Sequence, residues 1–456
     1  MTHREYPLER LFGRILSPFE QFLRRTTAGG IDLMASAVVA LPIASTQAGP
    51  AFSHFWEHRV GFSIAGRFGL DLSLHQCVND GLMALFFLLV GLEIKREILV
   101  GELSSPKDAA LPVFAAVGGM LVPASIYALF NAGTSTASGW GIPMATDIAF
   151  AIGILVLLAS RVPRNLIVFL TALAIADDIG AVLVIAIFYT SDLNLTWLGA
   201  AAGCLAVLLL LNRGGIRNPL PYAATGVLMW IAVHESGMHA TLAGIVLAFT
   251  IPARPAHSPD RFQQRIEELR AAFLADRLDF ETPDDPLSNH RMASIAEAME
   301  RSAAAVQSPQ QRIEHRLTPW VGFVVIPLFA LSNAGIDLLA IRWGDAMSSA
   351  VTLGIVSGLV IGKFAGIGFF SWIAVRLGLA RLPSGVAWSH VLGAAWLGGI
   401  GFTMSLFITQ LAFASAVVVE QAKLGIVLAS VIAAGIGLAW LVFLAPAADR
   451  AKESGV

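Results

Sequence analysis

Two adjacent aspartates, Asp177 and Asp178, lie in the middle of an apolar stretch that runs from Leu166 to Tyr189. The stretch has no other charged residue, and it is long enough to cross the hydrocarbon core of a lipid bilayer. An ionisable side chain at that depth costs at least about 2.5–3.5 kcal/mol, so such groups usually serve a function. The pair therefore predicts an ion or proton site on a transport pathway.

The composition agrees with a chain that lies largely in a membrane. Of its 456 residues, 56% are hydrophobic and 14% are charged, whereas a soluble protein carries about 25% charged residues. The net charge of −2 excludes a broadly basic partner of nucleic acids. Cys77 and Cys204 are too few for a disulfide framework and are expected to be buried thiols. No phosphate-binding glycine loop, metal-ligand cluster or nucleophile elbow occurs at a convincing spacing, so an ATP-driven pump is not expected.

Hydrophobic runs predict an all-α, polytopic membrane protein with about twelve transmembrane helices. The expected spans cover residues 30–48, 76–99, 109–130, 141–159, 165–189, 196–212, 221–234, 238–251, 318–335, 349–376, 387–413 and 423–445. The eighth is short for a full span. The fourth and eleventh contain internal glycine, and the fourth also proline. Such interruptions are tolerated at membrane depth where the freed backbone lines a cavity.

Basic residues alternate between the two sides of these spans. One set of loops holds arginines such as Arg161, Arg213 and Arg376, whereas the loops at 131–140, 190–196 and 414–422 have no lysine or arginine. The positive-inside rule places the basic side in the cytoplasm, and both termini with it.

The sequence divides into five expected parts. They are a cytoplasmic arm at 1–29, spans one to eight at 30–251, a cytoplasmic insert at 252–316, spans nine to twelve at 317–445 and a cytoplasmic tail at 446–456. The insert is rich in charges of both signs, which predicts a solvated segment. Ser258-Pro259 and Ser308-Pro309 are typical helix starts, and the alternative is a flexible loop with transient helices.

Three intramembrane charges can be assigned chemistry. Consecutive helical residues are turned by about 100°, so Asp177 and Asp178 cannot face the same side. Lys363, near the centre of the tenth span, is expected to pair with one of these aspartates. The alternatives are an aspartate pair satisfied by hydrogen bonds alone and a lysine that reaches to the interface.

Asp147 follows Thr146 inside the interrupted fourth span. If the ends of two half-helices meet there, Asp147 could neutralise their N-termini while Lys363 balances C-termini. Asp147 could equally be a simple N-cap of the helix that follows.

Charges near the cytoplasmic ends of spans form a further candidate group. Glu93, Arg96 and Glu97 close the second span, and Glu314 and His315 precede the ninth. These residues could attract cations and respond to pH, or they could simply anchor the helices at the interface. His239 is either a pH-responsive group or a packing residue.

Six strings resemble the NhaA family of bacterial sodium/proton antiporters. They are FFLLVGLEIKRE (86–97), PMATDIAFAIG (143–153), ALAIADDIGA (172–181), SGMHATLAG (236–244), PLFALSNAG (327–335) and GGIGFTMSLFI (398–408). The resemblance implies a transporter of the bacterial inner membrane that is not an enzyme and needs neither ATP nor a cofactor. It implies pH-regulated, electrogenic exchange of Na⁺ or Li⁺ for H⁺, and a fold of inverted repeats in which spans four and eleven are interrupted and cross.

The resemblance also implies roles for single residues. Asp178 would be the main ligand of Na⁺ or Li⁺, and Asp177 would pair with Lys363 when the cation is absent. The remaining implied roles are helix crossing for Thr146 and Asp147, a cytoplasmic pH-sensing funnel for Glu93, Arg96, Glu97, Glu314 and His315, and the family's periplasmic histidine position for His239.

This chain departs from the family pattern in three places. The insert is long, Phe364 stands where proline is expected after the lysine, and Gln311 stands where a basic residue is expected. The sequence is compatible with a homodimer.

Other functions would also place charged residues inside a membrane-spanning helix. A sodium-coupled solute symporter of related fold would share the buried charges and the interrupted spans. A channel would not require a lysine–aspartate pair, which is typical of a closed, alternating site. An intramembrane aspartyl protease is disfavoured because its two acids lie on different helices, whereas Asp177 and Asp178 are neighbours.

Overall fold

The computed structural model describes residues 49–64, 68–190, 193–278, 289–335 and 343–445, with short pieces between 35 and 46. The expected arm at 1–29, the tail at 446–456 and most of the first span lie outside these described residues.

The described chain is mostly helical. The elements up to residue 250 are α3 (Gly49–Glu57), β1 (Arg59–Ile64), β2 (Phe68–Ser73), α4 (Leu74–Gln76), η1 (Cys77–Leu82), α5 (Met83–Val100), η2 (Glu102–Ser104), α6 (Pro106–Asn131), η3 (Ala137–Met144), α7 (Ile148–Leu157), α8 (Arg164–Phe188), α9 (Leu195–Arg213), α10 (Pro219–Glu235) and α11 (Leu242–Thr250). The remaining elements are α12 (Pro259–Leu278), α13 (His290–Val306), α14 (Pro309–Trp320), η4 (Val321–Val325), α15 (Ile326–Asn333), α16 (Trp343–Met347), α17 (Ala350–Ser357), η5 (Gly358–Gly362), α18 (Lys363–Arg376), α19 (Trp388–Leu397), α20 (Phe402–Ala412) and α21 (Ala416–Phe443).

Eight helices of the described chain are long and apolar enough to cross a membrane, and the bent pair α19–α20, with 45° between its halves, makes up to nine. The expected count of twelve also requires α10 and α11, which are 17 and 9 residues long, and the undescribed first span. The number twelve therefore stays a prediction.

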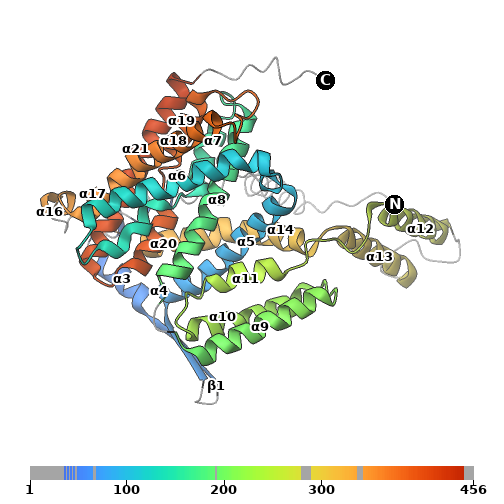
Figure 1. Cartoon of the computed structure of the whole chain (residues 1–456). Helices are drawn as coiled ribbons and strands as arrows, with labels where there is room; N and C mark the ends of the chain where they lie inside the picture. Colours follow the sequence, from blue (N-terminus) through green and yellow to red (C-terminus); the bar gives the residue numbers. More distant parts are fainter. Residues whose placement is uncertain are drawn as a thin grey trace.

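A short hairpin interrupts the expected all-α architecture. Strands β1 and β2 pair antiparallel, with Arg59 opposite Ser73. Arg59 also forms an exposed ion pair of 2.8 Å with Asp71. The prediction missed this hairpin because it considered only apolar runs long enough for a span. The hairpin face is the side of the molecule where α5 begins, and the insert face is the side where α5 ends beside α14 (Figure 1).

Helices α6 and α18 pack against each other at very short range. A Cβ at Gly366 would lie 2.1 Å from the carbonyl oxygen of Gly118, so only glycine permits this approach. The same contact brings the first turn of α18, with Lys363, close to α6. Residues beside the intramembrane lysine are thus fixed by backbone packing.

The expected insert is largely helical and leaves the bundle as a pair of packed helices, α12 and α13 (Figure 1). Its two ends return to the same place, because the carbonyl of Ala305 accepts the N–H groups of Ala256 and His257 at 2.9 and 3.1 Å. The N–H of Gln310 also donates to the carbonyl of Pro252 at 3.3 Å.

Ser308 starts α14 as a helix cap. Its hydroxyl and the side chain of Gln311 form a reciprocal capping box, with two bonds of 3.1 Å. Gln311, one of the departures from the family pattern, thus has a local structural role. Helix α14 continues through η4 into α15, so the last residues expected in the insert belong to the helix of the ninth span.

Candidate functional site

Asp177 and Lys363 form an ion pair inside the helix bundle. Asp177 lies on α8, and Lys363 is the first residue of α18. The Lys363 Nζ donates to both carboxylate oxygens of Asp177, at 2.9 and 2.8 Å, and both side chains are fully buried. Each charge offsets the desolvation of the other, so removal of either partner would leave an uncompensated buried charge.

Asp178 faces a different side of α8, because consecutive helical residues are turned by about 100°. The residue is 1% exposed, and neither carboxylate oxygen has a hydrogen-bond partner among the described residues. The charged groups that act on it are Asp177, Glu93, Asp147 and Lys363, and three of these four are acidic. An unpaired buried carboxylate is strongly disfavoured, so this group requires a proton or a cation.

Two breaks in the helical backbone meet beside these residues. One break separates η3 from α7, and the other separates α19 from α20. The Thr146 hydroxyl donates to the carbonyl of Gly398 at 2.8 Å, and the Asp147 N–H donates to the carbonyl of Ile400 at 2.6 Å. Thr146 also lies beside Asp177. The breaks of the fourth and eleventh expected spans are therefore in direct contact next to the ion pair.

Asp147 caps two helices at once. Its Oδ1 accepts the N–H of Phe150 in the first turn of α7 at 3.0 Å. Its Oδ2 accepts the N–H and the hydroxyl of Thr403, at the start of α20, at 3.1 and 2.6 Å. Helix N-termini carry partial positive charge, so one carboxylate serves both as N-cap and as compensating charge. The hydrogen bonds described for Lys363 go to Asp177, so its expected role at helix C-termini stays a prediction.

Two hydroxyl residues of α20 belong to this junction, although the sequence did not single them out. Thr403 holds Asp147, and the Ser405 Oγ donates to the carbonyl of Ile142 in η3 at 2.8 Å. Both lie in the GIGFTMS string, directly after the glycines of the break. Hydroxyl groups that follow such a break are the signal that could have identified them, since freed backbone groups and helix starts need local partners.

A second group of charges lies where α5 meets α14. The Arg96 guanidinium donates to Glu314 and lies 3.9 Å from the Glu97 carboxylate. The other oxygen of Glu314 is buried and has no partner among the described residues. His315 is exposed and acts electrostatically on Glu314. The structure therefore brings the expected cytoplasmic group together from two helices.

Glu93 connects this group with the buried aspartates. It interacts electrostatically with Glu314, Arg96 and Glu97 on one side and with Asp178 on the other. An acidic residue is thus coupled electrostatically both to the charges near the insert face and to the unpaired carboxylate.

His239 lies apart from both groups, in the turn between α10 and α11. Its Nε2 donates to the carbonyl of Tyr189 at the end of α8. The structure does not bring His239 near the ion pair through any contact described for it.

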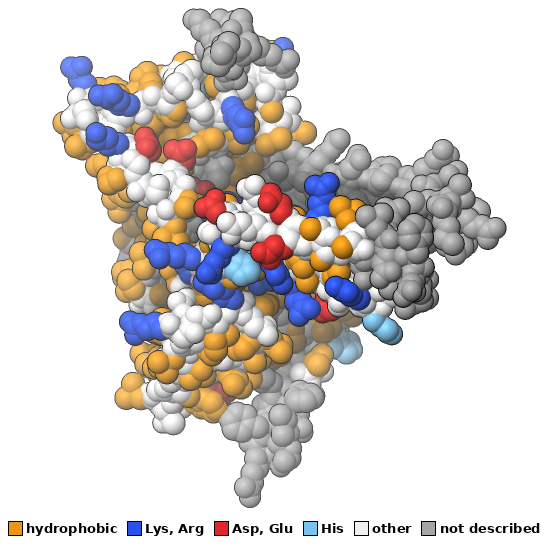
Figure 2. Space-filling view, turned by 90° about the vertical axis from the view of Figure 1, so that its right-hand side faces the viewer, with side chains coloured by type: hydrophobic (Ala, Val, Ile, Leu, Met, Phe, Trp, Pro, Cys, Tyr) orange, Lys and Arg blue, Asp and Glu red, His pale blue; other side chains and the backbone are white. Residues whose placement is uncertain are grey.

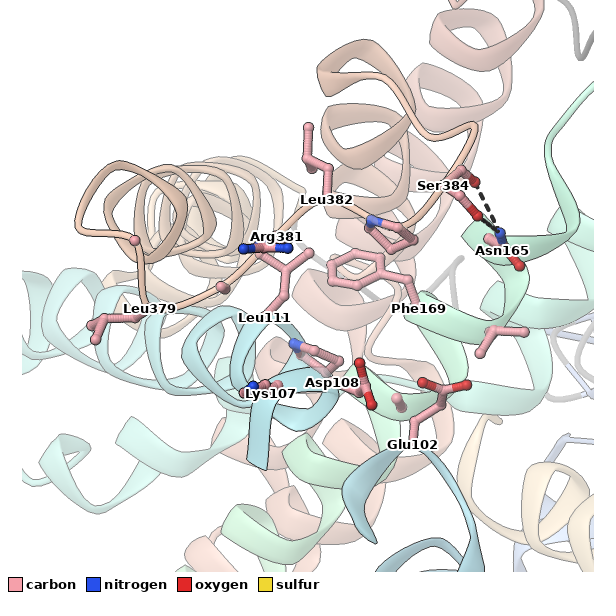
Figure 3. A pocket seen from close by; sticks show the side chains of 16 residues that line it. Glu102, Lys107, Asp108, Leu111, Asn165, Phe169, Leu379, Arg381, Leu382 and Ser384 are labelled. Atoms are coloured by element: carbon pink, nitrogen blue, oxygen red, sulfur yellow. Dashed lines mark hydrogen bonds between the residues drawn. The ribbon is translucent and has the colours of Figure 1, made fainter. Parts of the chain in front are cut away.

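A cavity of about 580 Å³ opens elsewhere, at the insert-side ends of α6 and α8 (Figure 3). Charged side chains surround it, among them Glu102, Asp108 and Arg381, and the Phe169 ring lies at its centre in this view. Asn165 closes one side by donating to Ser384, at 2.9 Å to the carbonyl and 2.8 Å to the hydroxyl. None of the predicted site residues lines this cavity.

Comparison with known proteins gives the family. Residues 20–441 match the family model described as Na+/H+ antiporter 1. A protein of Syntrophobacter fumaroxidans named Na(+)/H(+) antiporter NhaA is 63% identical over 439 residues, which are 96% of this chain and 93% of that protein. A protein of the same name from Acidithiobacillus ferrooxidans is 57% identical over 94% of this chain and 97% of that protein. The resemblance inferred from the six strings is confirmed: the chain belongs to the Na+/H+ antiporter 1 family.

Proposed function

We propose that this protein exchanges Na⁺, or Li⁺, for H⁺ across the bacterial inner membrane. The observation that carries the proposal is Asp178, a fully buried carboxylate without a described partner, directly beside the Asp177–Lys363 pair. The names of the relatives, Na(+)/H(+) antiporter, support the same exchange.

Competition for the two carboxylates explains how exchange would proceed. Asp178 needs either a proton or a cation, and carboxylate oxygens are suitable ligands for Na⁺. A cytoplasmic Na⁺ displaces the proton of Asp178 and draws Asp177 away from Lys363. The Asp177–Lys363 pair supplies a second proton, either from Asp177 in the form in which the lysine is neutral or from the Lys363 ammonium after Asp177 has left it, since strongly coupled groups titrate as a unit. Both protons pass into the cytoplasm. The loaded site then opens to the other side by alternating access.

Two protons for one Na⁺ would make each cycle move net charge. The membrane potential would then contribute about 2.3 kcal/mol per charge per 100 mV. Exchange is therefore expected to be electrogenic.

The architecture proposed for this exchange has twelve spans in two inverted repeats, with the interrupted spans four and eleven crossing at the site. The contacts of Thr146 with Gly398 and of Asp147 with Thr403 support the crossing. The Asp147 carboxylate then stabilises the facing N-termini of α7 and α20.

We place the insert face in the cytoplasm, with both termini. Figure 2 shows lysine and arginine side chains gathered on this side among acidic ones, as the positive-inside rule requires of a cytoplasmic surface. Glu93, Arg96, Glu97, Glu314 and His315 then form a cation-attracting, pH-sensing funnel that leads toward Asp178. His239 would respond to pH separately, near the opposite face.

The central test is Asp178→Asn in everted membrane vesicles with a pH-sensitive dye. The amide keeps the shape but removes the charge that holds a cation, so addition of Na⁺ or Li⁺ should no longer dequench the dye. Asp108→Asn is the matched control, because Asp108 is an exposed acid at the rim of the separate cavity, and its vesicles should respond like the wild type.

Near-normal exchange by Asp178→Asn would refute the assigned ion site. Sodium movement that depends on an added organic solute would instead indicate a symporter.

A further inference from the structure

Tyr189, at the end of α8, holds the half-helix η3 by its hydroxyl group. The Tyr189 hydroxyl donates to the carbonyl of Ser138 at 2.7 Å and accepts the N–H of Gly141 at 3.3 Å. Both partners belong to η3. The Ser138 carbonyl and the Gly141 N–H are three residues apart, the spacing of one 3₁₀ turn, so the single hydroxyl bridges one turn of η3 as both donor and acceptor.

The same hydroxyl fixes how closely η3 approaches α8. A Cβ at Gly141 would lie 2.7 Å from the Tyr189 hydroxyl oxygen, and 3.2 and 3.4 Å from two ring carbons. The absence of a side chain at Gly141 allows the η3 backbone to contact the Tyr189 phenol directly. The contact thus determines position as well as hydrogen bonding.

The half-helix leads directly to the ion site. It ends at Met144, and Ala145, Thr146 and Asp147 follow as extended chain that is almost completely buried. Thr146 lies beside Asp177 and donates to Gly398. Thr146 should therefore move together with η3 when η3 shifts along its axis, because close-packed buried segments move together.

We propose that Tyr189 is a positioning residue, whose hydroxyl sets the place of η3 and through it the place of Thr146 beside the Asp177–Lys363 pair. This inference rests on the proposed Na⁺/H⁺ exchange. It adds Tyr189 to the residues that determine ion binding, although Tyr189 itself contacts neither ion. Tyr189 acts from outside the site, whereas the aspartates act within it.

The first test is Tyr189→Phe, which keeps the ring and removes the hydroxyl. The matched control is Tyr222→Phe. Tyr222 lies on α10, away from the site, is 2% exposed, and its hydroxyl donates to the carbonyl of Ile216 at 3.0 Å. In proteoliposomes, Tyr189→Phe should raise the apparent KM for Na⁺ roughly three- to ten-fold and change kcat less, as expected for loss of one oriented hydrogen bond. Tyr222→Phe should leave the KM unchanged, and both variants should unfold at similar temperatures.

The second test is a steric rescue. Gly141→Ala should raise the KM more than Tyr189→Phe, because the new methyl meets the phenol oxygen at 2.7 Å. In the double variant the closest atom is gone, so its KM should fall below that of Gly141→Ala alone.

The inference is overturned if Tyr189→Phe matches Tyr222→Phe in KM, or if the double variant shows the product of the two single effects. Those outcomes leave the proposed function intact, provided the wild type exchanges Na⁺ for H⁺. A wild-type protein without such exchange would overturn both.

Discussion

A buried ion pair makes the stability of this protein depend on both partners together. Lys363→Met removes the ammonium group and leaves the fully buried Asp177 carboxylate without its countercharge and without the two hydrogen bonds that Lys363 donates to it. Loss of one partner of such a pair typically costs about 3–5 kcal/mol. Lys363→Met should therefore lower the midpoint of thermal unfolding in detergent and also weaken exchange or shift its pH profile.

The double variant Asp177→Asn/Lys363→Met separates stability from transport. Both charges are gone, so most of the lost stability should return, whereas exchange should stay impaired. Lys107→Met, at an exposed lysine of the cavity rim, is the control and should unfold like the wild type. A Lys363→Met protein with normal stability and an unchanged pH profile would remove the lysine from the mechanism.

Charged residues inside an apolar span could be predicted from the sequence, together with the pairing of Lys363 and an aspartate, whereas the uncharged residues of the site could not. Asp177, Asp178 and Lys363 stand out because charge inside an apolar span is expensive whatever surrounds it. Thr403 carries no such cost, and its bond to Asp147 depends on how two distant helices meet. Phe364 shows the same limit, since its ring stacks on Trp396 at 4.2 Å and only packing reveals this contact.

The glycines of α6 and α18 act at the scale of whole elements, by allowing two helices to touch through their backbones. Gly366→Ala should force α18 away from α6, because the added Cβ would lie 2.1 Å from the Gly118 carbonyl oxygen and no side chain can move aside. The shift would also displace Lys363, three residues earlier on α18. Reduced thermal stability and reduced exchange are both expected.

Gly203→Ala on α9 is the matched control for Gly366→Ala. Nothing lies within 4 Å of its expected Cβ, so the alanine should leave stability unchanged or raise it by up to about 1 kcal/mol through helix propensity. Equal unfolding temperatures for the two variants would contradict the close approach of α6 and α18.

Helix starts were easier to predict than helix irregularities. Ser308-Pro309 marks the start of α14, and Ser258-Pro259 marks that of α12, because caps are local chemistry. The π-helical segments η1 and η5, just before Met83 and Lys363, have no such local signal. They change which face the following residues present, so the exact partner of Lys363 could not be read from helical periodicity.

At the scale of the whole molecule, the expected insert is attached by a narrow stem. Its ends meet where the Ala305 carbonyl accepts two N–H groups from residues 256 and 257, and α12 and α13 pack on each other beyond that point. The Arg96–Glu314 ion pair lies on α5 and α14, outside the part of the insert that extends beyond this stem. Because the two ends of the insert already lie together, a short linker can join them at a small cost in loop-closure entropy. Removal of the solvated helices between these ends should leave the packing of the transmembrane helices unchanged.

We therefore expect that residues 258–304 can be replaced by a Gly/Ser linker of about four residues without loss of transport. The shortened protein should exchange Na⁺ for H⁺ within about two-fold of the wild-type rate and with the same pH profile, since α14 keeps its capping residue Ser308 and its bond from Gln310 to the Leu92 carbonyl. Proteoliposome exchange over a pH series, with thermal unfolding as the check on folding, measures both. A shortened protein that folds normally but has lost exchange, or has moved its pH profile, would show that α12 and α13 act on the funnel rather than beside it.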